Sequence, residues 1–244
     1  MRDYQIELEN RVKFIQNILK ESHADGIVFG NSGGKDSALV GILCKKACEN
    51  TLSVPMPCHS KRNFGIDLDD GNELSEKFGI ENITFDLTSV RQALVDTLSA
   101  KLELNNTALT NIAPRLRMTT LYAVAACRNM LVAGTGNKDE YYMGYFTKWG
   151  DGAYDFNPIA DLSVAEIYEF LAYLDAPRSI IEKAPSAGLF EGQTDEDEMG
   201  VTYAAIEKYI ETGEATPHDR EIIDRYHTRS EHKRRTPEKY GVTE

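Results

Sequence analysis

The feature that most constrains this chain is the turn Gly30-Asn31-Ser32-Gly33-Gly34-Lys35-Asp36-Ser37, which directly follows the apolar residues 27–29. Paired glycines allow backbone torsions and close approaches to a ligand that a side chain would block. Consecutive backbone N–H groups, together with the N-terminus of a following helix, form a site for an anion such as phosphate. The turn therefore predicts a buried strand before it, a helix after it and an anion between them.

The polar side chains of this turn leave two interpretations open. The hydroxyls of Ser32 and Ser37 can donate to phosphate oxygens, whereas Asp36 would repel them. Asp36 either caps the helix without any ligand or holds Mg²⁺ that bridges phosphates. The spacing matches neither GxxxxGK[ST] nor GxGxxG, so the two commonest nucleotide loops are excluded.

The rest of the chain alternates short apolar stretches with amphipathic ones. We expect strands at residues 26–29, 51–56, 83–85 and 130–133, and helices at residues 4–21, from 36, 67–78, 90–104, 114–128, 163–174, 202–211 and 217–229. Ser163 and Glu166 form a capping box at the start of one of these helices. The alternation predicts an α/β fold in three layers, α/β/α, with a parallel, twisted sheet flanked by helices.

Two polar, glycine-rich loops leave strand ends in this scheme, at residues 30–37 and 134–140. Ligands of open parallel sheets bind beyond the carboxyl ends of the strands. The two loops are therefore predicted to form one site. Residues 144–157, rich in glycine and aromatic side chains, are expected to be a long functional loop, and residues 185–200 an acidic loop.

Composition excludes several classes of protein. The 244 residues include 27 basic and 39 acidic ones, a net charge of −12, which argues against general nucleic-acid binding. Four cysteines without a CxxC pair give no basis for a zinc site and are typical of a reducing compartment. No signal peptide or membrane-spanning run is visible. We expect a cytoplasmic protein without a membrane partner.

Longer segments carry a family resemblance. SGGKDS resembles the SGGxDS signature of the PP-loop ATP pyrophosphatases, which activate a carboxylate or carbonyl as an adenylate and release pyrophosphate. Further segments, in order along nearly the whole chain, resemble the ammonia-dependent NAD synthetases of that family. They are residues 134–140, 144–152, 157–162, 183–187, 192–198 and 231–235.

The resemblance implies a Rossmann-like fold of the adenine nucleotide alpha hydrolase type, with one domain over residues 1–244 and no glutaminase domain. It implies a ligase that forms a C–N bond: nicotinic acid adenine dinucleotide (deamido-NAD), ATP and ammonia would give NAD, AMP and pyrophosphate through an NAD-adenylate. A homodimer with the dinucleotide site at the subunit interface is also implied. A PP-loop enzyme acting on another carboxylate, and a non-catalytic nucleotide sensor, remain as alternatives.

The resemblance also assigns residues to roles. The implied ATP contacts are Gly30, Asn31, Ser32, Gly33, Gly34, Lys35, Asp36, Ser37, Thr135 and Ser186. The implied deamido-NAD contacts are Arg115, Lys148, Asp155, His232 and Lys233. Asp36 and Glu140 would hold Mg²⁺, whose preference is for oxygen ligands, and would stabilise the leaving pyrophosphate. Asp151 and Asp155 are both candidates for the base that deprotonates ammonium.

At two positions the role implied by the family resemblance is ambiguous or its usual residue is missing. Arg115 and Arg117 lie two apart and so point in different directions on a helix, and only the resemblance favours Arg115. Val164 stands where bacterial relatives often have a lysine that contacts ATP. Lys35, or Lys61 and Arg62, would then have to supply positive charge to the phosphates. Without the resemblance, Lys148, Asp155 and the basic tail would pass for solvated surface charges.

Overall fold

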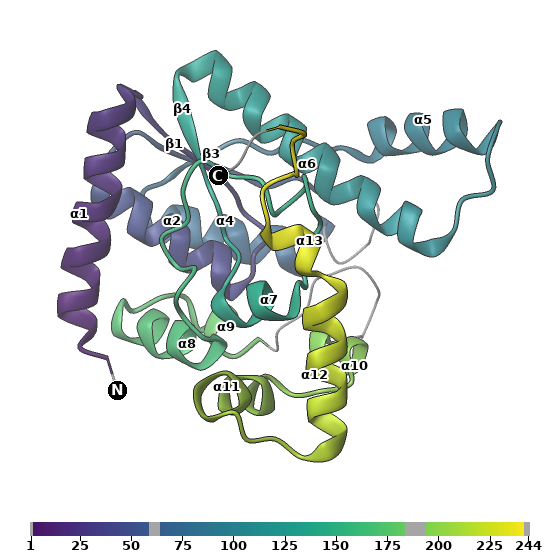
Figure 1. Cartoon of the computed structure of the whole chain (residues 1–244). Helices are drawn as coiled ribbons and strands as arrows, with labels where there is room; N and C mark the ends of the chain where they lie inside the picture. Colours follow the sequence, from purple (N-terminus) through teal and green to yellow (C-terminus); the bar gives the residue numbers. More distant parts are fainter. Residues whose placement is uncertain (1, 59–63, 184–193, 242–244) are drawn as a thin grey trace.

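The computed structural model describes residues 2–58, 64–183 and 194–241 of the chain (Figure 1). In these residues four parallel strands form one sheet in the order β3-β2-β1-β4. The strands are β1 (Gly26–Gly30), β2 (Thr51–Val54), β3 (Glu81–Asn82) and β4 (Met130–Ala133). The helices are α1 (Tyr4–Ser22), α2 (Lys35–Ala47), α4 (Ile66–Phe78), α5 (Thr88–Ser99), α6 (Asn106–Arg128), α7 (Lys138–Met143), α8 (Val164–Tyr173), α9 (Arg178–Ile181), α10 (Asp195–Met199), α11 (Tyr203–Thr212), α12 (Pro217–Arg229) and α13 (Glu231–Arg234).

The central strand β1 separates two hydrophobic cores. Ile27 and Phe29 point into a core formed with α1, α2 and α8, whereas Val28 points to the opposite face, which α6 covers. Both faces of the sheet are thus buried under helices, as the absence of polar positions in this strand requires. The predicted α/β fold with helices on both faces is confirmed.

A third hydrophobic cluster lies outside the sheet. It joins α7, α8, α10, α11 and α12 through Met143, Val164, Met199, Ile206 and Ile223. In Figure 1 these helices occupy the lower part of the molecule, with α12 and α13 rising toward the sheet. No helix of the described part of the chain is long and apolar enough to cross a membrane.

The third strand is earlier and shorter than the sequence predicts. We expected residues 83–85, but the regular strand is β3. Phe85 still donates its N–H to the carbonyl of Pro55 at 3.0 Å. A proline has no N–H with which to continue the ladder, so the pairing beyond β2 remains one-sided.

Two helical boundaries were also wrong, and one helix was not predicted. α6 begins at Asn106 and not at residue 114, because Asn105 caps it through Ala108 and Pro114 is accommodated inside the helix. α5 ends at Ser99, short of residue 104. The expected acidic loop contains helix α10, which Thr194 and Asp197 start with a capping box. Residues 184–193 of that loop lie outside the described residues.

A buried carboxyl group fixes α7 to α8. Oδ2 of Asp139 accepts a hydrogen bond from the N–H of Val164 at 2.8 Å, and the side chain of Asp139 is fully buried. Its Oδ1 is buried without a hydrogen-bond partner among the described residues. Burial, assisted by the nearby charge of Glu207, raises the pKa of Asp139 to about 7.

This raised pKa predicts a pH dependence of stability. In the unfolded chain the pKa of an aspartate is about 3.9, so the folded state holds a proton that the unfolded state has released. The stability contributed by the protonated group is present below about pH 4 and is lost as the pH rises through 7. Asp139→Asn keeps an oxygen acceptor for Val164 but cannot ionise. We expect its melting temperature, relative to the wild type, to be higher at pH 8 than at pH 5.

Circular dichroism melts at the two pH values provide the measurement. A difference between variant and wild type that is the same at both values would contradict the assignment of this proton to Asp139.

Candidate active site

A cavity of about 900 Å³ opens beyond the carboxyl ends of β1 and β4. Both glycine-rich loops line it, so they meet at one place as predicted. The first contributes Gly30, Asn31, Ser32, Gly34 and Lys35, and the second Gly134, Thr135, Gly136 and Glu140. The loop from residue 144, α6 and α12 also contribute to the walls.

The turn after β1 is built around Gly33. Gly33 has a φ of +68°, in the left-handed region that favours glycine. A Cβ at this position would collide with the carbonyl oxygen of Asp67, in the first turn of α4. The glycine therefore allows a close approach between the turn and α4, and this approach sets the position of the N-terminus of α2.

The N-terminus of α2 has no side-chain cap. Its N-cap is Gly34, whereas Asn137 and Ser163 cap α7 and α8 through their side chains. The interpretation of Asp36 as a helix cap was therefore wrong. The first N–H groups of α2 remain available to an anion in the cavity, and the helix dipole adds to their attraction.

Asp36 instead belongs to a charged cluster. Its Oδ2 accepts from Nζ of Lys35 at 2.7 Å, and its Oδ1 accepts from Nδ2 of Asn137 at 3.0 Å. Oε2 of Glu140 accepts from the N–H of Asn137 at 3.1 Å. Asn137 thus connects Asp36 to Glu140, although 104 positions separate the two carboxylates in the sequence.

The charges of the cluster affect the pKa values of Glu140 and Lys35. Burial and then the charge of Asp36 raise the pKa of Glu140 well above its usual value. Burial alone would lower the pKa of Lys35, but the carboxylates of Asp36 and Glu140 outweigh it and raise that pKa. The site therefore favours a positive charge between the two acids.

This donor set fits Mg²⁺ only when phosphate oxygens complete it. Among the described residues, no group of three or more His, Cys, Asp or Glu side chains could hold a metal ion. Asp36 and Glu140 supply oxygen ligands, and Mg²⁺ is usually held by one or two carboxylates together with substrate phosphates and water.

Most of the predicted ATP contacts lie together. Gly30, Asn31, Ser32, Gly34, Lys35, Asp36, Ser37 and Thr135 line the cavity, and Gly33 supports the turn from behind. Ser186, like Lys61 and Arg62, lies outside the described residues.

Val164 is 6 % exposed and packs in the third hydrophobic cluster, so its side chain takes no part in an anion site. Lys35, 5.7 Å from the ring centre of Tyr203, is the lysine that borders Asp36.

The structure separates the two candidate bases. Asp151 lines the cavity, and its Oδ1 accepts from the N–H of Thr147 at 3.0 Å. Asp151 is exposed at the cavity wall, but the protein atoms packed around its carboxylate partly desolvate it, and this raises its pKa. Asp155 lies outside the cavity lining. It accepts from the N–H of Val132 at 2.7 Å and from the hydroxyl of Tyr122 at 3.2 Å, which fixes the end of the loop to β4.

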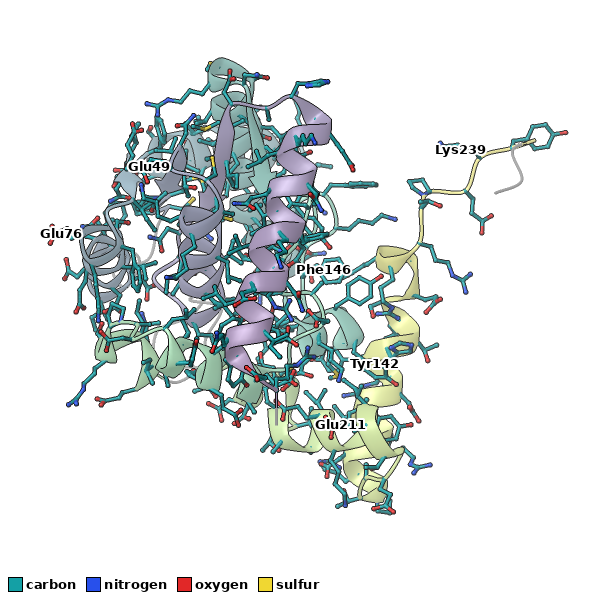
Figure 2. All side chains as sticks on the ribbon, turned by 90° about the vertical axis from the view of Figure 1, so that its left-hand side faces the viewer. Glu49, Glu76, Tyr142, Phe146, Glu211 and Lys239 are labelled. Atoms are coloured by element: carbon teal, nitrogen blue, oxygen red, sulfur yellow. The ribbon has the colours of Figure 1, made fainter. Side chains whose placement is uncertain are left out.

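The predicted dinucleotide contacts fall into two places. Lys233 lines the cavity and donates from Nζ to the carbonyls of Gly144 and Phe146, at 2.7 and 2.6 Å. Lys148 and His232 lie outside the lining, where Nζ of Lys148 donates to the carbonyl of His232 at 2.6 Å. Figure 2 shows Phe146 beside the chain that leads to the C-terminal tail, which extends away from the body at Lys239.

The two arginines of α6 have different surroundings. Arg115 is exposed outside the cavity lining, and its guanidinium lies 3.4 Å from the carbonyl of Lys148. Arg117 lines the cavity and donates from Nε to the carbonyl of Met56 at 3.1 Å. Burial lowers the pKa of Arg117. Sequence reasoning passed over Arg117, because choosing between the two requires the orientation of α6.

Other cavity residues were also missed. Lys183 and Tyr168 line the cavity on the side of α4 and α8, and Arg225 and Arg229 line it on the side of α12. Lys183 lies in a segment that carries the family resemblance, which was the available signal. No motif marked the other three.

Comparisons with known proteins agree with this geometry. The NAD synthase family model matches residues 7–244. An NH₃-dependent NAD⁺ synthetase of Carboxydothermus hydrogenoformans is 45% identical over 239 residues, which cover 97% of each chain.

Two solved structures extend the likeness to the fold. The NMN synthetase of Francisella tularensis has a TM-score of 0.92 at 36% identity, covering 99% of this chain and all of that one. The NH₃-dependent NAD synthetase of Campylobacter jejuni has a TM-score of 0.81 at 32% identity, with both chains fully covered. The family model covers nearly the whole sequence, and these relatives share its fold from end to end; the chain belongs to the NAD synthase family.

Proposed function

We propose that the protein amidates nicotinic acid adenine dinucleotide with ammonia, consuming ATP and producing NAD, AMP and pyrophosphate. The observation that carries this proposal is the uncapped N-terminus of α2, whose first turn includes Asp36 and which shares one cavity with Glu140. This arrangement suits a polyphosphate whose charge increases as pyrophosphate leaves. The membership of the chain in the NAD synthase family supplies the substrate class.

In the first half-reaction a nicotinate carboxylate oxygen attacks the α-phosphorus of ATP, and the bond to the bridging oxygen of pyrophosphate breaks. The N–H groups of the first turn of α2 and the ammonium of Lys35 face the leaving group. Asp36 and Glu140 would hold Mg²⁺ together with phosphate oxygens, and the ion would supply positive charge to the leaving group.

In the second half-reaction ammonia attacks the activated carbonyl, and AMP leaves. Ammonium must first lose a proton, because only neutral ammonia is nucleophilic. Asp151 is the carboxylate that we assign to this step, since it borders the cavity and its raised pKa makes it a better base than an ordinary aspartate. Asp155, which is bonded to the backbone of β4, is assigned a positioning role for the loop.

The dinucleotide is proposed to bind across two subunits of a homodimer. Arg115, Lys148 and His232 contact one another in a row outside the cavity of the single chain. α5 and the first half of α6 project from the body nearby (Figure 1), and α5 has no buried residue. A second subunit packed on this side would cover these three residues and so form an enclosed binding site with them.

Light scattering tests this arrangement. We expect a mass of twice the 27.3 kDa of one chain. A monomer with full activity would rule out a shared site.

The mononucleotide is a second candidate substrate. The structural likeness to an NMN synthetase, with a TM-score of 0.92, favours it. Assays with nicotinic acid mononucleotide and the dinucleotide in parallel separate the two. A higher kcat/KM for the dinucleotide supports the first proposal, and a higher value for the mononucleotide replaces it with the second.

Replacing either Asp36 or Glu140 should strongly slow the reaction with little effect on folding. Asp36→Asn and Glu140→Gln keep side-chain size but weaken the cation site. Because loss of one group that stabilises developing charge costs roughly 10²–10³-fold in rate, we expect a fall in kcat of that order. Pyrophosphate and NAD are followed together, with ATP, Mg²⁺, the dinucleotide and ammonium each omitted in turn. Wild-type rates in both variants would remove these carboxylates from the mechanism.

Lys35 is expected to contribute to the binding of ATP more than to that of the dinucleotide. Its ammonium borders Asp36 in the place where positive charge is needed, and Val164 supplies none. We expect Lys35→Gln to raise the KM for ATP by about tenfold, the equivalent of ~1.4 kcal/mol, with a smaller change in the KM for the dinucleotide. Steady-state kinetics at saturating ammonium measure both constants. An unchanged KM for ATP would exclude a contact between Lys35 and the phosphates.

A further inference from the structure

Lys183 lines the cavity two residues beyond α9, and the reaction described above gives it no role. Its Nζ donates to Oδ1 of Asp67 at 2.8 Å, to Oδ2 of Asp70 at 2.7 Å and to the carbonyl of Gly33 at 3.3 Å. An ammonium group has three N–H bonds, and these three acceptors use all of them. The side chains of Lys183, Asp67 and Asp70 are 15, 11 and 9 % exposed, so the cluster is largely shielded from water.

The acceptors of Lys183 come from two elements that meet at the phosphate-binding turn. Gly33 belongs to the turn itself, and Asp67 and Asp70 belong to α4. The turn and α4 are already in close contact, because a Cβ at Gly33 would strike the carbonyl of Asp67. A hydrogen bond from the hydroxyl of Tyr168 to the carbonyl of Lys183, at 2.7 Å, adds α8 to the arrangement. Lys183 therefore joins the turn, α4 and α8.

The charges of the cluster matter for a polyphosphate ligand. Asp67 lines the same cavity as the turn, so an unpaired carboxylate there would repel phosphate. Lys183 balances one of the two negative charges of the cluster and hydrogen-bonds to both carboxylates. Removing one partner from a buried ion pair leaves an uncompensated charge, which is strongly unfavourable.

We propose that Lys183 is a positioning residue for the triphosphate of ATP: it holds Gly33 against α4, so that the N-terminus of α2 faces the phosphates, and it screens Asp67 and Asp70 from them. This inference rests on the proposed function for the identity of the nucleotide. Lys183 acts through the turn, so its loss should weaken the binding of ATP and spare the binding of the dinucleotide.

The test compares two variants with the wild type. Lys183→Met removes the charge and all three hydrogen bonds. Lys183→Met combined with Asp70→Asn removes one positive and one negative charge, which avoids an additional buried charge but still loses the contact with Gly33. We expect the single variant to bind a non-hydrolysable ATP analogue at least tenfold more weakly by calorimetry. The double variant should recover part, but not all, of this loss.

Lys77→Met is the matched control. Lys77 lies on α4, as Asp70 does, and like Lys183 it pairs with an aspartate: Asp175, at 2.9 Å. Neither Lys77 nor Asp175 lines the cavity. We expect this control to bind the analogue as the wild type does. Circular dichroism establishes that each variant is folded. If Lys183→Met does not fold, the affinity of the double variant for the analogue tests the proposal.

Kinetics provide the second readout. For a folded variant, kcat/KM for ATP should fall at least tenfold, while the KM for the dinucleotide changes less than threefold. Wild-type affinity for the analogue in either folded Lys183 variant, or an equal loss for both nucleotides, would overturn the proposal. Wild-type protein that binds the analogue but makes no NAD would instead refute the proposed function and leave the binding test of Lys183 intact.

Discussion

The close contact between Gly33 and the first turn of α4 is the constraint on which the site depends. It is possible only because Gly33 has no side chain and adopts a positive φ. The contact places the N-terminus of α2 at the open end of the sheet, with no side chain occupying its first N–H groups. The proposed phosphate site, the location of Asp36 and the arrangement around Lys183 all depend on this position.

Charge balance explains how an acidic chain can bind anionic substrates. The sequence carries a net charge of −12, yet among the described residues as many basic as acidic side chains line the cavity. Lys35 offsets one of the two negative charges of Asp36 and Glu140, and Lys183 offsets one of those of Asp67 and Asp70. The remaining cations lie elsewhere around the walls. These are Arg117, Arg225, Arg229 and Lys233. Local placement, and not overall charge, determines what this protein can bind.

Much of the fold was predictable because its signals are local. Apolar strands followed by amphipathic helices predicted the parallel sheet, and Ser163 with Glu166 predicted the start of α8, where both halves of the capping box are present. The errors have equally local causes. Pro55 interrupts the ladder after β2, and Pro114 looked like a helix start because the cap at Asn105 lies nine residues earlier. Helix α10 was hidden in an acidic stretch that reads as solvated loop.

By itself the sequence determined the class of fold and the glycine turn after β1, since these depend on short-range sterics and periodicity, and it supplied the residue types of the proposed phosphate and magnesium site. Only the tertiary structure decided which of several similar residues take part. Arg117 and Asp151 line the cavity while Arg115 and Asp155 do not, and Lys183 reaches Gly33 across 150 positions of sequence. Such choices depend on how helices and loops are rotated against one another, and that rotation is set by packing across the whole chain.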